Sequence, residues 1–442
     1  MGWEEDAMLR ELGLPNVEAL FDDIPEKVRV KGLPIPAGRG EQDVVHHITA
    51  ILRKNRGGDV MPTFLGGGLY DHFVPASVRA ITSRSEFYTA YTPYQAELSQ
   101  GILQALFEYQ SLIAELTGLD VANTSMYDGS TALGEAALMA HRLNGRKEIL
   151  VPRSMHWERR QVLTSYLHGA GMRIRDIPWE EKTGLLNLSA LRLGVTPDTA
   201  AVYFENPGFF GPFEDRVDEI RAAAGEALLI VGANPLALAV TKAPGDYGAD
   251  IVVGEGQPLG NAVNFGGPLL GIFACRAEHV RKAPGRIIGL TKDAKGHRAF
   301  CMTLVTREQH IRREKAMSNI CTNQTLMAVA AVAYAAVLGG NGLRRVAAEN
   351  VHRARRLMAA INRVPGFAAP LFDGYHFNEF VVRSTRDYGE ISRSLLDQGV
   401  HGGLSLTKAF PELGQSALFA TTEVHTDEDQ DRLVKALEAL TR

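Results

Sequence analysis

Six short apolar runs, separated by stretches of helical periodicity, constrain the fold of this chain more than any other feature. The runs lie at residues 120–122, 148–151, 172–174, 200–204, 227–231 and 250–253. Strands that alternate with helices form a mostly parallel sheet, because a parallel connection must cross over the sheet and is usually helical. The sequence therefore predicts an α/β fold with a central sheet covered by helices on both faces.

The chain is long enough, at 442 residues, to form more than one domain. Residues 1–61 are predicted to form short helices with an apolar stripe, and residues 62–325 a large α/β domain. Residues 326–442 are predicted to form a smaller α+β domain. The elements expected from residue 325 on are a helix over 325–338 that ends at Gly339-Gly340, a helix over 343–361, strands over 377–382 and 417–422, and helices over 388–398 and 426–440.

Composition and charge exclude several classes of function. Apolar residues make up 45% of the chain and charged residues 22%, and the net charge of -4 gives no reason to expect nucleic acid or an anionic membrane as partner. No apolar run is expected to reach membrane-spanning length, and the acidic residues 1–6 are unlike a targeting leader. The three cysteines are sparse and lack metal-ligand spacing, so a cytoplasmic protein without a metal site is expected.

Residues 84–97 form an aromatic and polar segment that is predicted to lead into a helix. Thr92 is expected to be the N-cap, Pro93 the first helical residue, and Glu97 an acidic residue near the helix start. Apolar residues then recur at helical spacing until Gly118, which is expected to end the helix. The side chains held near the helix start would be Tyr88, Tyr91, Tyr94 and Gln95. Such groups either face a ligand or merely pack, and the pattern alone leaves both open.

In a parallel α/β sheet, ligands bind at the carboxyl ends of the strands. Tyr127 and Asp128 open the glycine- and hydroxyl-containing turn 127–131 before an alanine-rich helix, which is either an anion-binding turn or a capped helix start. His156 follows another strand and either presents a flat ring to a planar ligand or has a structural role.

Two further strand ends lack the groups that pyridoxal phosphate would need. Glycine and alanine stand at 232 and 233, where an aspartate would pair with the pyridine nitrogen. Gln257 lies just after the next strand, where a lysine would form the Schiff base, and no lysine occurs between Lys242 and Lys282. Without this amine the chain has no self-sufficient site for that cofactor.

Several long motifs resemble the P-protein of the glycine cleavage system, the pyridoxal-phosphate-dependent glycine decarboxylase. Within that family they resemble the first (alpha) subunit of the two-chain form. The motifs are residues 66–75, 84–101, 120–129, 254–260 and 306–315, the last leading into 318–324. The resemblance covers nearly the whole chain.

The resemblance implies an aspartate-aminotransferase-like fold, that of fold type I pyridoxal-phosphate-dependent transferases. It also implies an oxidoreductase of glycine catabolism, in which glycine is decarboxylated and its aminomethyl group passes to the lipoyl arm of the H-protein. The implied partner is a lysine-bearing second subunit that holds the cofactor covalently, in an α2β2 heterotetramer. This chain would complete the active site at the subunit interface and would be inactive alone, without a catalytic lysine of its own.

The resemblance further implies which residues face the partner's cofactor. The interface residues expected are Tyr88, Tyr91, Thr92, Tyr94, Gln95, Glu97, Ser318, Asn319, Cys321, Thr322 and Asn323. The residues expected around a vestigial cofactor pocket are Tyr127, Asp128, His156, Gly232 and Gln257, with His156 matching the histidine that stacks on the cofactor in lysine-bearing relatives. Arg312, Arg313 and Lys315 either add positive charge near the interface or form a solvated helix face.

Two other functions compete with this interpretation. The first is an independent pyridoxal-phosphate enzyme, such as a transaminase, that uses an unexpected lysine. Lys242 is the nearest candidate, although it precedes the strand that should carry the amine. The second is a scaffold or regulatory subunit that lines no active site.

Overall fold

The computed structural model describes residues 2–30, 32–58, 60–264, 267–320 and 322–440, which divide into two compact units at residue 57. The first unit contains the helix α1 (Gly2–Leu12), the short helices η1 (Val17–Phe21) and η2 (Glu26–Val28), and α2 (Glu41–Leu52). Short helices were predicted here and are confirmed. None of the described residues of this unit is buried, and the apolar stripe of α2 is exposed.

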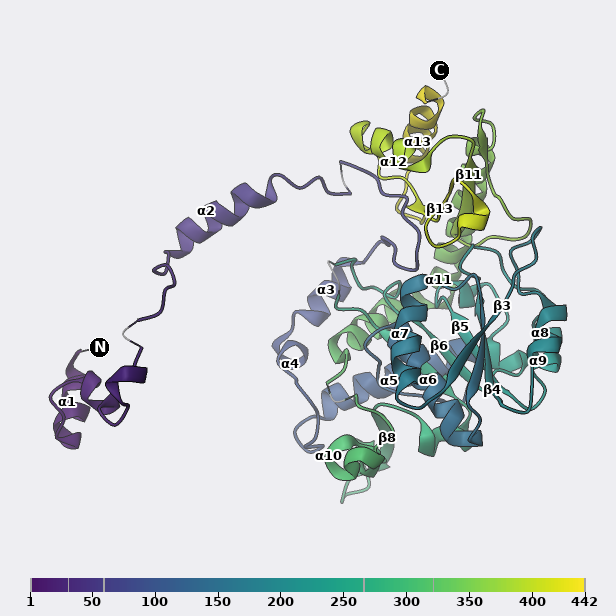
Figure 1. Ribbon diagram of the computed structural model, residues 1–442. Coiled ribbons are helices and arrows are strands. Elements are labelled where there is room, and N and C mark those ends of the chain that lie inside the picture. Colours follow the sequence, from purple (N-terminus) through teal and green to yellow (C-terminus); the bar gives the residue numbers. More distant parts are fainter. Residues whose placement is uncertain (1, 31, 59, 265–266, 321, 441–442) are drawn as a thin grey trace. The chain divides into compact units, whose positions relative to one another are not determined.

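The second unit is built around a seven-stranded sheet with the strand order β1-β7-β6-β5-β4-β2-β3 (Figure 1). The strands are β1 (Val121–Ala122), β2 (Glu148–Pro152), β3 (Arg173–Ile177), β4 (Thr199–Asn206), β5 (Leu228–Ala233), β6 (Ile251–Glu255) and β7 (Gly271–Cys275). β2 to β6 are mutually parallel, and β7 runs antiparallel to both β1 and β6. The six predicted strands and the mostly parallel sheet are confirmed. β7 was not predicted, because its short apolar run lies outside the strand–helix alternation.

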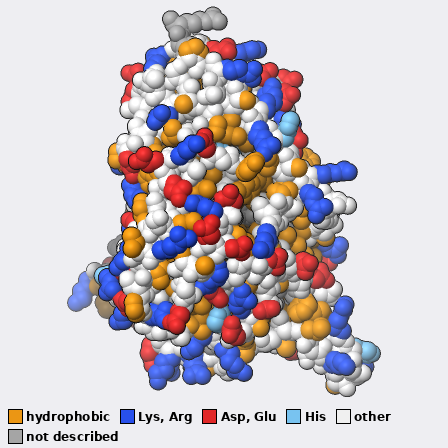
Figure 2. All heavy atoms as spheres, turned by 90° about the vertical axis from the view of Figure 1, so that its right-hand side faces the viewer, with side chains coloured by type: hydrophobic (Ala, Val, Ile, Leu, Met, Phe, Trp, Pro, Cys, Tyr) orange, Lys and Arg blue, Asp and Glu red, His pale blue; other side chains and the backbone are white. Residues whose placement is uncertain are grey.

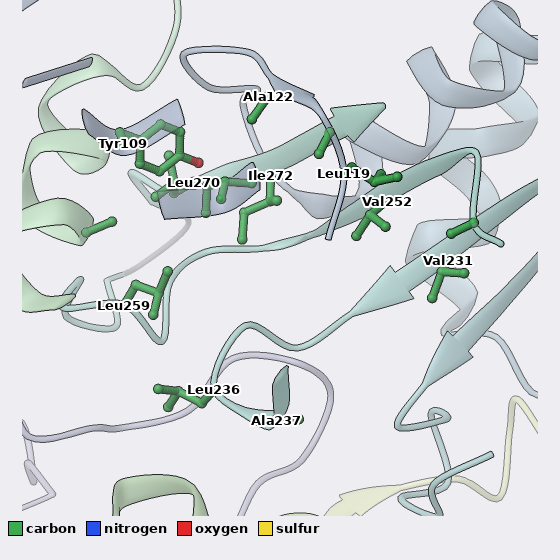
Figure 3. Close-up of a cluster of buried hydrophobic side chains, with 14 of the residues drawn as sticks. Tyr109, Leu119, Ala122, Val231, Leu236, Ala237, Val252, Leu259, Leu270 and Ile272 are labelled. Carbon is green, nitrogen blue, oxygen red and sulfur yellow. The ribbon is translucent and has the colours of Figure 1, made fainter. Parts of the chain in front are cut away.

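Helices cover both faces of the sheet, as predicted. On one face Leu150, Val202 and Leu229 pack with residues of α5 (Gln100–Thr117), α8 (Leu188–Gly194) and α9 (Val217–Ala224). Figure 3 shows members of this core, among them Tyr109 of α5 and Val231, Val252 and Ile272 of three strands. On the other face Ile149, Ala201 and Ile230 pack with α6 (Gly129–Asn144) and α7 (Trp157–His168). Neighbouring residues of one strand therefore point into different cores.

The predicted start of the helix after the aromatic segment is wrong. α4 (Ser85–Tyr88) is a single turn, residues 89–99 are non-helical, and α5 begins at Gln100 rather than at Pro93. Ser99, and not Thr92, is the N-cap residue of α5. The side chain of Gln100 bonds both the N–H and the C=O of Phe300, at 2.9 Å each, and fixes the true start. The end is as predicted, with Gly118 at φ +66° and its N–H donated to Ala114.

Phe300 belongs to an antiparallel hairpin, β8 (Ile287–Lys292) and β9 (Arg298–Thr303), that was not predicted. The short helices around it and elsewhere in the second unit are α3 (Ala76–Thr82), η3 (Ala237–Ala239), η4 (Pro244–Tyr247), η5 (Ala277–Lys282), η6 (Val305–Arg307), α10 (Gln309–Arg312), η7 (Arg313–Lys315) and η8 (Pro411–Leu413). The hairpin packs on α5 and so lies beside the aromatic segment.

The helix α11 (Thr325–Ile361) contains the two helices that were predicted around Gly339. Gly339 has φ +61° and ψ 175°, which kinks the helix at the predicted boundary. By length and composition α11 could cross a membrane, which corrects the expectation that no run is long enough. Its most apolar stretch is 44% buried within the protein, and the helix packs against α3 and α5 as a core helix does.

The remaining residues form a second, antiparallel sheet in the order β10-β11-β13-β12. Its strands are β10 (Phe367–Ala368), β11 (Glu379–Ser384), β12 (Leu404–Ser405) and β13 (Ser416–Ala420), and its helices are α12 (Tyr388–Asp397) and α13 (Asp427–Ala439). The predicted strands and helices of this region are present, shifted by one or two residues. Whether residues 326–442 are a separate domain from 62–325 stays a prediction, since the whole of 58–442 forms one compact unit.

Acidic and basic side chains are interspersed over the face shown in Figure 2. No large area of one sign is visible on this face, in keeping with the small net charge of -4. A surface of this kind does not steer polyanions toward it.

Candidate functional site

The two segments predicted to face a partner meet in the structure. The hydroxyl oxygens of Tyr91 and Thr322 lie 2.8 Å apart, although the residues are 231 positions apart in the chain. Tyr94 is held by Arg286, whose Nη2 donates to the tyrosine hydroxyl at 3.1 Å and whose guanidinium lies 5.5 Å from the ring centre. Tyr88, Tyr91 and Tyr94 are 70%, 70% and 53% exposed, so these rings are available to a partner or ligand.

The segment 318–323 is anchored on the elements behind it. The Ser318 hydroxyl donates to Glu135 of α6 at 2.9 Å, and the Asn323 amide donates to the Thr124 hydroxyl at 2.8 Å. Burial raises the pKa of Glu135, while the Ser318 hydrogen bond opposes the rise. Asn319 and Thr322 are exposed, and Cys321 lies outside the described residues. Asn319 and Thr322 thus present an amide and a hydroxyl to solvent beside two anchored side chains.

The other predicted interface residues lie on the same aromatic segment. Tyr88, Gln95 and Glu97 are exposed, and Thr92 is half-buried. Arg312, Arg313 and Lys315 are also exposed, on η7 and the end of α10.

A separate pocket lies at the carboxyl ends of β4, β5 and β6, where a sheet of this topology places its ligand. Two of the predicted pocket residues, His156 and Gly232, line it. Among the lining residues that were not predicted as site residues, six carry a charged or phenolic side chain, namely Tyr70, Arg159, Tyr203, Glu205, Glu255 and Glu379. They include one cation and three carboxyl groups. A signal for them existed in the sequence, because a glutamate at the end of a buried apolar strand, as at 205, needs a polar partner.

Arg159, Tyr203 and Glu205 form an ion network inside this pocket. The Arg159 guanidinium pairs with the Glu205 carboxylate, and the Tyr203 hydroxyl donates to the same carboxylate at 2.8 Å. Arg159 also donates to the Tyr203 oxygen at 3.3 Å. Burial by itself would lower the pKa of Arg159, but the carboxylate and the phenol more than offset this and raise it. Burial and the carboxylate of Glu205 raise the pKa of Tyr203, so the phenol stays neutral.

Glu379 holds the glycine-rich segment 66–70 against the pocket. Its carboxyl group accepts the Gly67 N–H at 2.6 Å and the Tyr70 hydroxyl. Burial raises the pKa of Glu379 to about 7, although these two hydrogen bonds oppose the rise. Gln257 is fully buried on the other side of the segment, where its amide bonds the N–H and C=O of Tyr70 at 3.2 and 2.9 Å. Gln257 therefore fixes backbone and does not line the pocket.

Asp128 caps α6 instead of leaving its first N–H groups to a ligand. Its carboxylate accepts from the N–H groups of Ser130 and Thr131 at 2.8 Å each. The structure therefore has the capped helix start that was one of the two alternatives for this turn. Tyr127 is half-buried and packs against the core on the α6 face of the sheet.

His156 caps α7 and stacks on its neighbour. Its Nδ1 accepts the Glu158 N–H at 3.1 Å, and its ring lies 4.4 Å from the Trp157 ring. Burial and the nearby Arg159 lower the pKa of His156 to about 4, so the ring is neutral at physiological pH. The His156 ring thus already stacks on Trp157 and caps α7.

The described residues of the pocket do not fit pyridoxal phosphate. No lysine is among the residues that line it, and Lys242 pairs with Asp218 at 3.9 Å on the surface. A Cβ atom on Gly232 would stand 2.4 Å from the Tyr203 hydroxyl oxygen, so no aspartate can replace this glycine while Tyr203 stays in place. The Tyr203 hydroxyl therefore occupies the space in which the carboxylate that binds the pyridine nitrogen would lie.

Comparison with known proteins identifies the family. Residues 2–437 match the family model described as glycine cleavage system P-protein. The chain belongs to this family. It is 49% identical to the probable glycine dehydrogenase (decarboxylating) subunit 1 of Pyrococcus abyssi, and 45% identical to that of Desulfitobacterium hafniense. Each comparison covers 98% of this chain and 97% of the relative. The predicted resemblance to the P-protein family, and to its subunit 1, is confirmed.

Solved structures confirm the fold class. An inhibitor-bound glycine decarboxylase (P-protein) of the glycine cleavage system is 42% identical, with a TM-score of 0.91, over 100% of this chain and 98% of that one. Sphingosine-1-phosphate lyase from Burkholderia pseudomallei has a TM-score of 0.68 at 15% identity, over 94% of this chain and 93% of that one. The second match shows the fold alone. The P-protein family thus has the fold type I architecture that was predicted.

Proposed function

We propose that this chain is the subunit of a two-chain glycine decarboxylase that does not anchor the cofactor. The observation that carries this proposal is the contrast between two sites of one molecule. No lysine is among the described residues that line the pocket at the strand ends, and an ion network fills it, whereas Tyr91, Tyr94 and Thr322 are exposed and hydrogen-bonded. The relatives named subunit 1 support a second subunit as the partner.

In this proposal the partner subunit bears the lysine and holds pyridoxal phosphate, and the two chains form an α2β2 heterotetramer in the cytoplasm. The substrates are glycine and the lipoyl arm of the H-protein. Glycine loses its carboxylate as carbon dioxide, and its aminomethyl group passes to the lipoyl disulfide, which is reduced. The part of this chain is to wall the interface site and exclude water from it.

Tyr91 and Tyr94 are the residues best placed for that part. Each ring is exposed, yet its hydroxyl is fixed, by Thr322 in one case and by Arg286 in the other. Rings held in this way lose little conformational entropy when a partner covers them. Gln95 and Glu97 lie beside them and offer hydrogen bonds to glycine or to the lipoyl group.

Replacement of Tyr94 by alanine tests the role of the segment. We expect at least about a tenfold loss of glycine–bicarbonate exchange in the two-subunit complex, with unchanged assembly on size-exclusion chromatography. Tyr375→Ala is the matched control, because Tyr375 is also 70% exposed with Arg355 over its ring, at 5.9 Å. Full activity of the Tyr94→Ala variant would indicate that the aromatic segment only packs and does not line the active site.

An experiment on the isolated chain tests the proposal that the partner subunit, and not this chain, anchors the cofactor. Borohydride treatment with pyridoxal phosphate should leave no pocket peptide labelled on a lysine, and glycine–bicarbonate exchange should appear only when the second subunit is added. A trapped imine and exchange by the isolated chain would favour an independent enzyme instead. Full exchange by the second subunit without this chain would favour a scaffold.

A further inference from the structure

The carboxyl group of Glu255 lies at the N-terminus of α6 and binds three backbone N–H groups. One oxygen accepts the N–H of Gly129 at 3.0 Å, and the other accepts those of Gln257 and Leu270, also at 3.0 Å each. The three donors belong to the first turn of α6, the loop after β6 and the residue before β7. Glu255 thus joins the start of α6 to the loop after β6 and to the start of β7.

A group of converging N–H donors at the start of a 16-residue helix is a site for an anion, because the helix dipole adds positive potential there. In this chain the carboxyl group of Glu255 takes the place of such an anion. Asp128 accepts the next two N–H groups of the same helix, so the N–H groups of the first three residues all donate to carboxyl groups of the chain itself.

The other half of the pocket is also filled by the chain. Arg159 and Glu205 pair with each other, and the Tyr203 hydroxyl occupies the space that a Cβ atom on Gly232 would need. A phosphorylated aromatic ligand would have to displace both the carboxyl group at α6 and this ion network. Displacement of a buried ion pair leaves unpaired charges and is strongly unfavourable.

We infer that the Glu255 carboxyl group is an internal hydrogen-bond acceptor that occupies the phosphate position of the pocket, so that this subunit excludes phosphorylated cofactors by its own side chains and not merely by lack of a lysine. Glu255 also accepts the backbone N–H of Gln257, and the side-chain amide of Gln257 binds the backbone of Tyr70. The former ligand site therefore serves as a rigid support for segment 66–70. The inference on Glu255 does not depend on whether the aromatic segment takes part in catalysis.

Thermal unfolding of the whole chain with phosphate tests the inference. Inorganic phosphate and pyridoxamine 5′-phosphate, which has no aldehyde and forms no imine with surface lysines, are the probes, and sodium chloride of equal ionic strength is the blank. For the unaltered chain we expect no rise in Tm with either probe. For Glu255→Ala, which frees three N–H groups, we expect a saturable rise of about 2 °C or more.

Glu379→Ala is the matched control, because it opens the same pocket beside the same Arg159 but frees no N–H group of α6. It should show no phosphate-dependent rise. Saturable stabilisation of the unaltered chain by either probe would overturn the inference. So would a folded Glu255→Ala variant that responds to phosphate no more than Glu379→Ala does.

Glu255→Gln keeps the side-chain length and covers the case in which the alanine variant does not fold. Its single amide oxygen can accept either the N–H of Gly129 or the N–H groups of Gln257 and Leu270, but not both sets. We expect amide hydrogen exchange to rise about tenfold or more, either at Gly129 or at both Gln257 and Leu270. Unchanged protection at all three amides would show that the carboxyl group does not join these segments.

Discussion

At the scale of single residues, the pocket is unusual for the carboxyl groups it buries. Glu379 and Glu255 both have a pKa raised to about 7, chiefly by burial, and the neighbouring Asp128 adds to the rise for Glu255. Glu379 faces Tyr70, Glu205 and Arg159, and the single cation is already paired with Glu205. Each of the two groups therefore holds a proton in the folded state at a pH where the unfolded chain has lost it.

This difference predicts a pH dependence of stability. Between about pH 4.5 and about pH 7 the folded state binds more protons than the unfolded state, so the free energy of unfolding falls as the pH rises and then levels off. The Glu379→Gln variant cannot ionise at this position. It therefore lacks the part of the fall in the free energy of unfolding that Glu379 causes. Relative to the unaltered chain, it should gain up to about 3 kcal/mol between about pH 4.5 and about pH 8, measured by urea unfolding.

Other titrating groups are common to both proteins and cancel in this difference. Glu115→Gln, on the exposed face of α5, is the control, because it removes a carboxyl group that is not buried. A constant difference for Glu379→Gln would mean that Glu379 titrates normally in the folded protein.

At the scale of elements, glycines decide where helices bend and end. Gly118 closes α5 in the left-handed conformation, and Gly339 kinks α11 at φ +61° and ψ 175°. The second combination is open to glycine almost alone, because a Cβ atom would clash with its own backbone. The kink lets the two halves of α11 continue in different directions after Leu338.

The kink predicts opposite effects of alanine at two adjacent sites. Gly339→Ala should lower the free energy of unfolding by about 1–3 kcal/mol, because the new side chain is incompatible with the backbone and not because of crowding. Gly340→Ala is the control, since that residue has no positive φ and equally open space around it. It should be neutral or stabilise by up to about 1 kcal/mol. Equal effects at the two sites in denaturant titrations would contradict the role of the kink.

At the scale of the whole molecule, the two units differ in how they are stabilised. Residues 58–442 contain four apolar clusters that join both sheets to their helices. The described residues up to 57 contain no buried side chain, although Trp3, Phe21 and Ile48 are among the large apolar residues there. A unit without a core has little tertiary stabilisation of its own.

A peptide of residues 1–57 should therefore lose its helical circular dichroism gradually on heating. Its two α-helices have 11 and 12 residues, a length at which isolated helices are marginal in water. The full chain, measured in parallel, should show a cooperative transition from its larger unit. A sharp transition of the peptide that does not depend on its concentration would show that this unit has a core.

The sequence by itself determined the class of fold and the chemical deficit of the pocket. The strand–helix alternation predicted six of the seven strands of the main sheet, because burial on both faces requires continuous apolar runs. The lack of a lysine between 242 and 282 is a property of composition that no packing can change. The glycines at 118 and 339 predicted helix ends correctly, since the backbone conformations there are local.

Only the tertiary structure decided what depends on contacts between distant residues. The start of α5 follows from Gln100 binding Phe300, 200 residues away, and not from the local capping signals at Thr92. The meeting of Tyr91 with Thr322, and of Glu255 with the first turn of α6, likewise joins segments that no periodicity connects. Local patterns report which residues must be buried, whereas the partner of a buried polar group is set by how the whole chain packs.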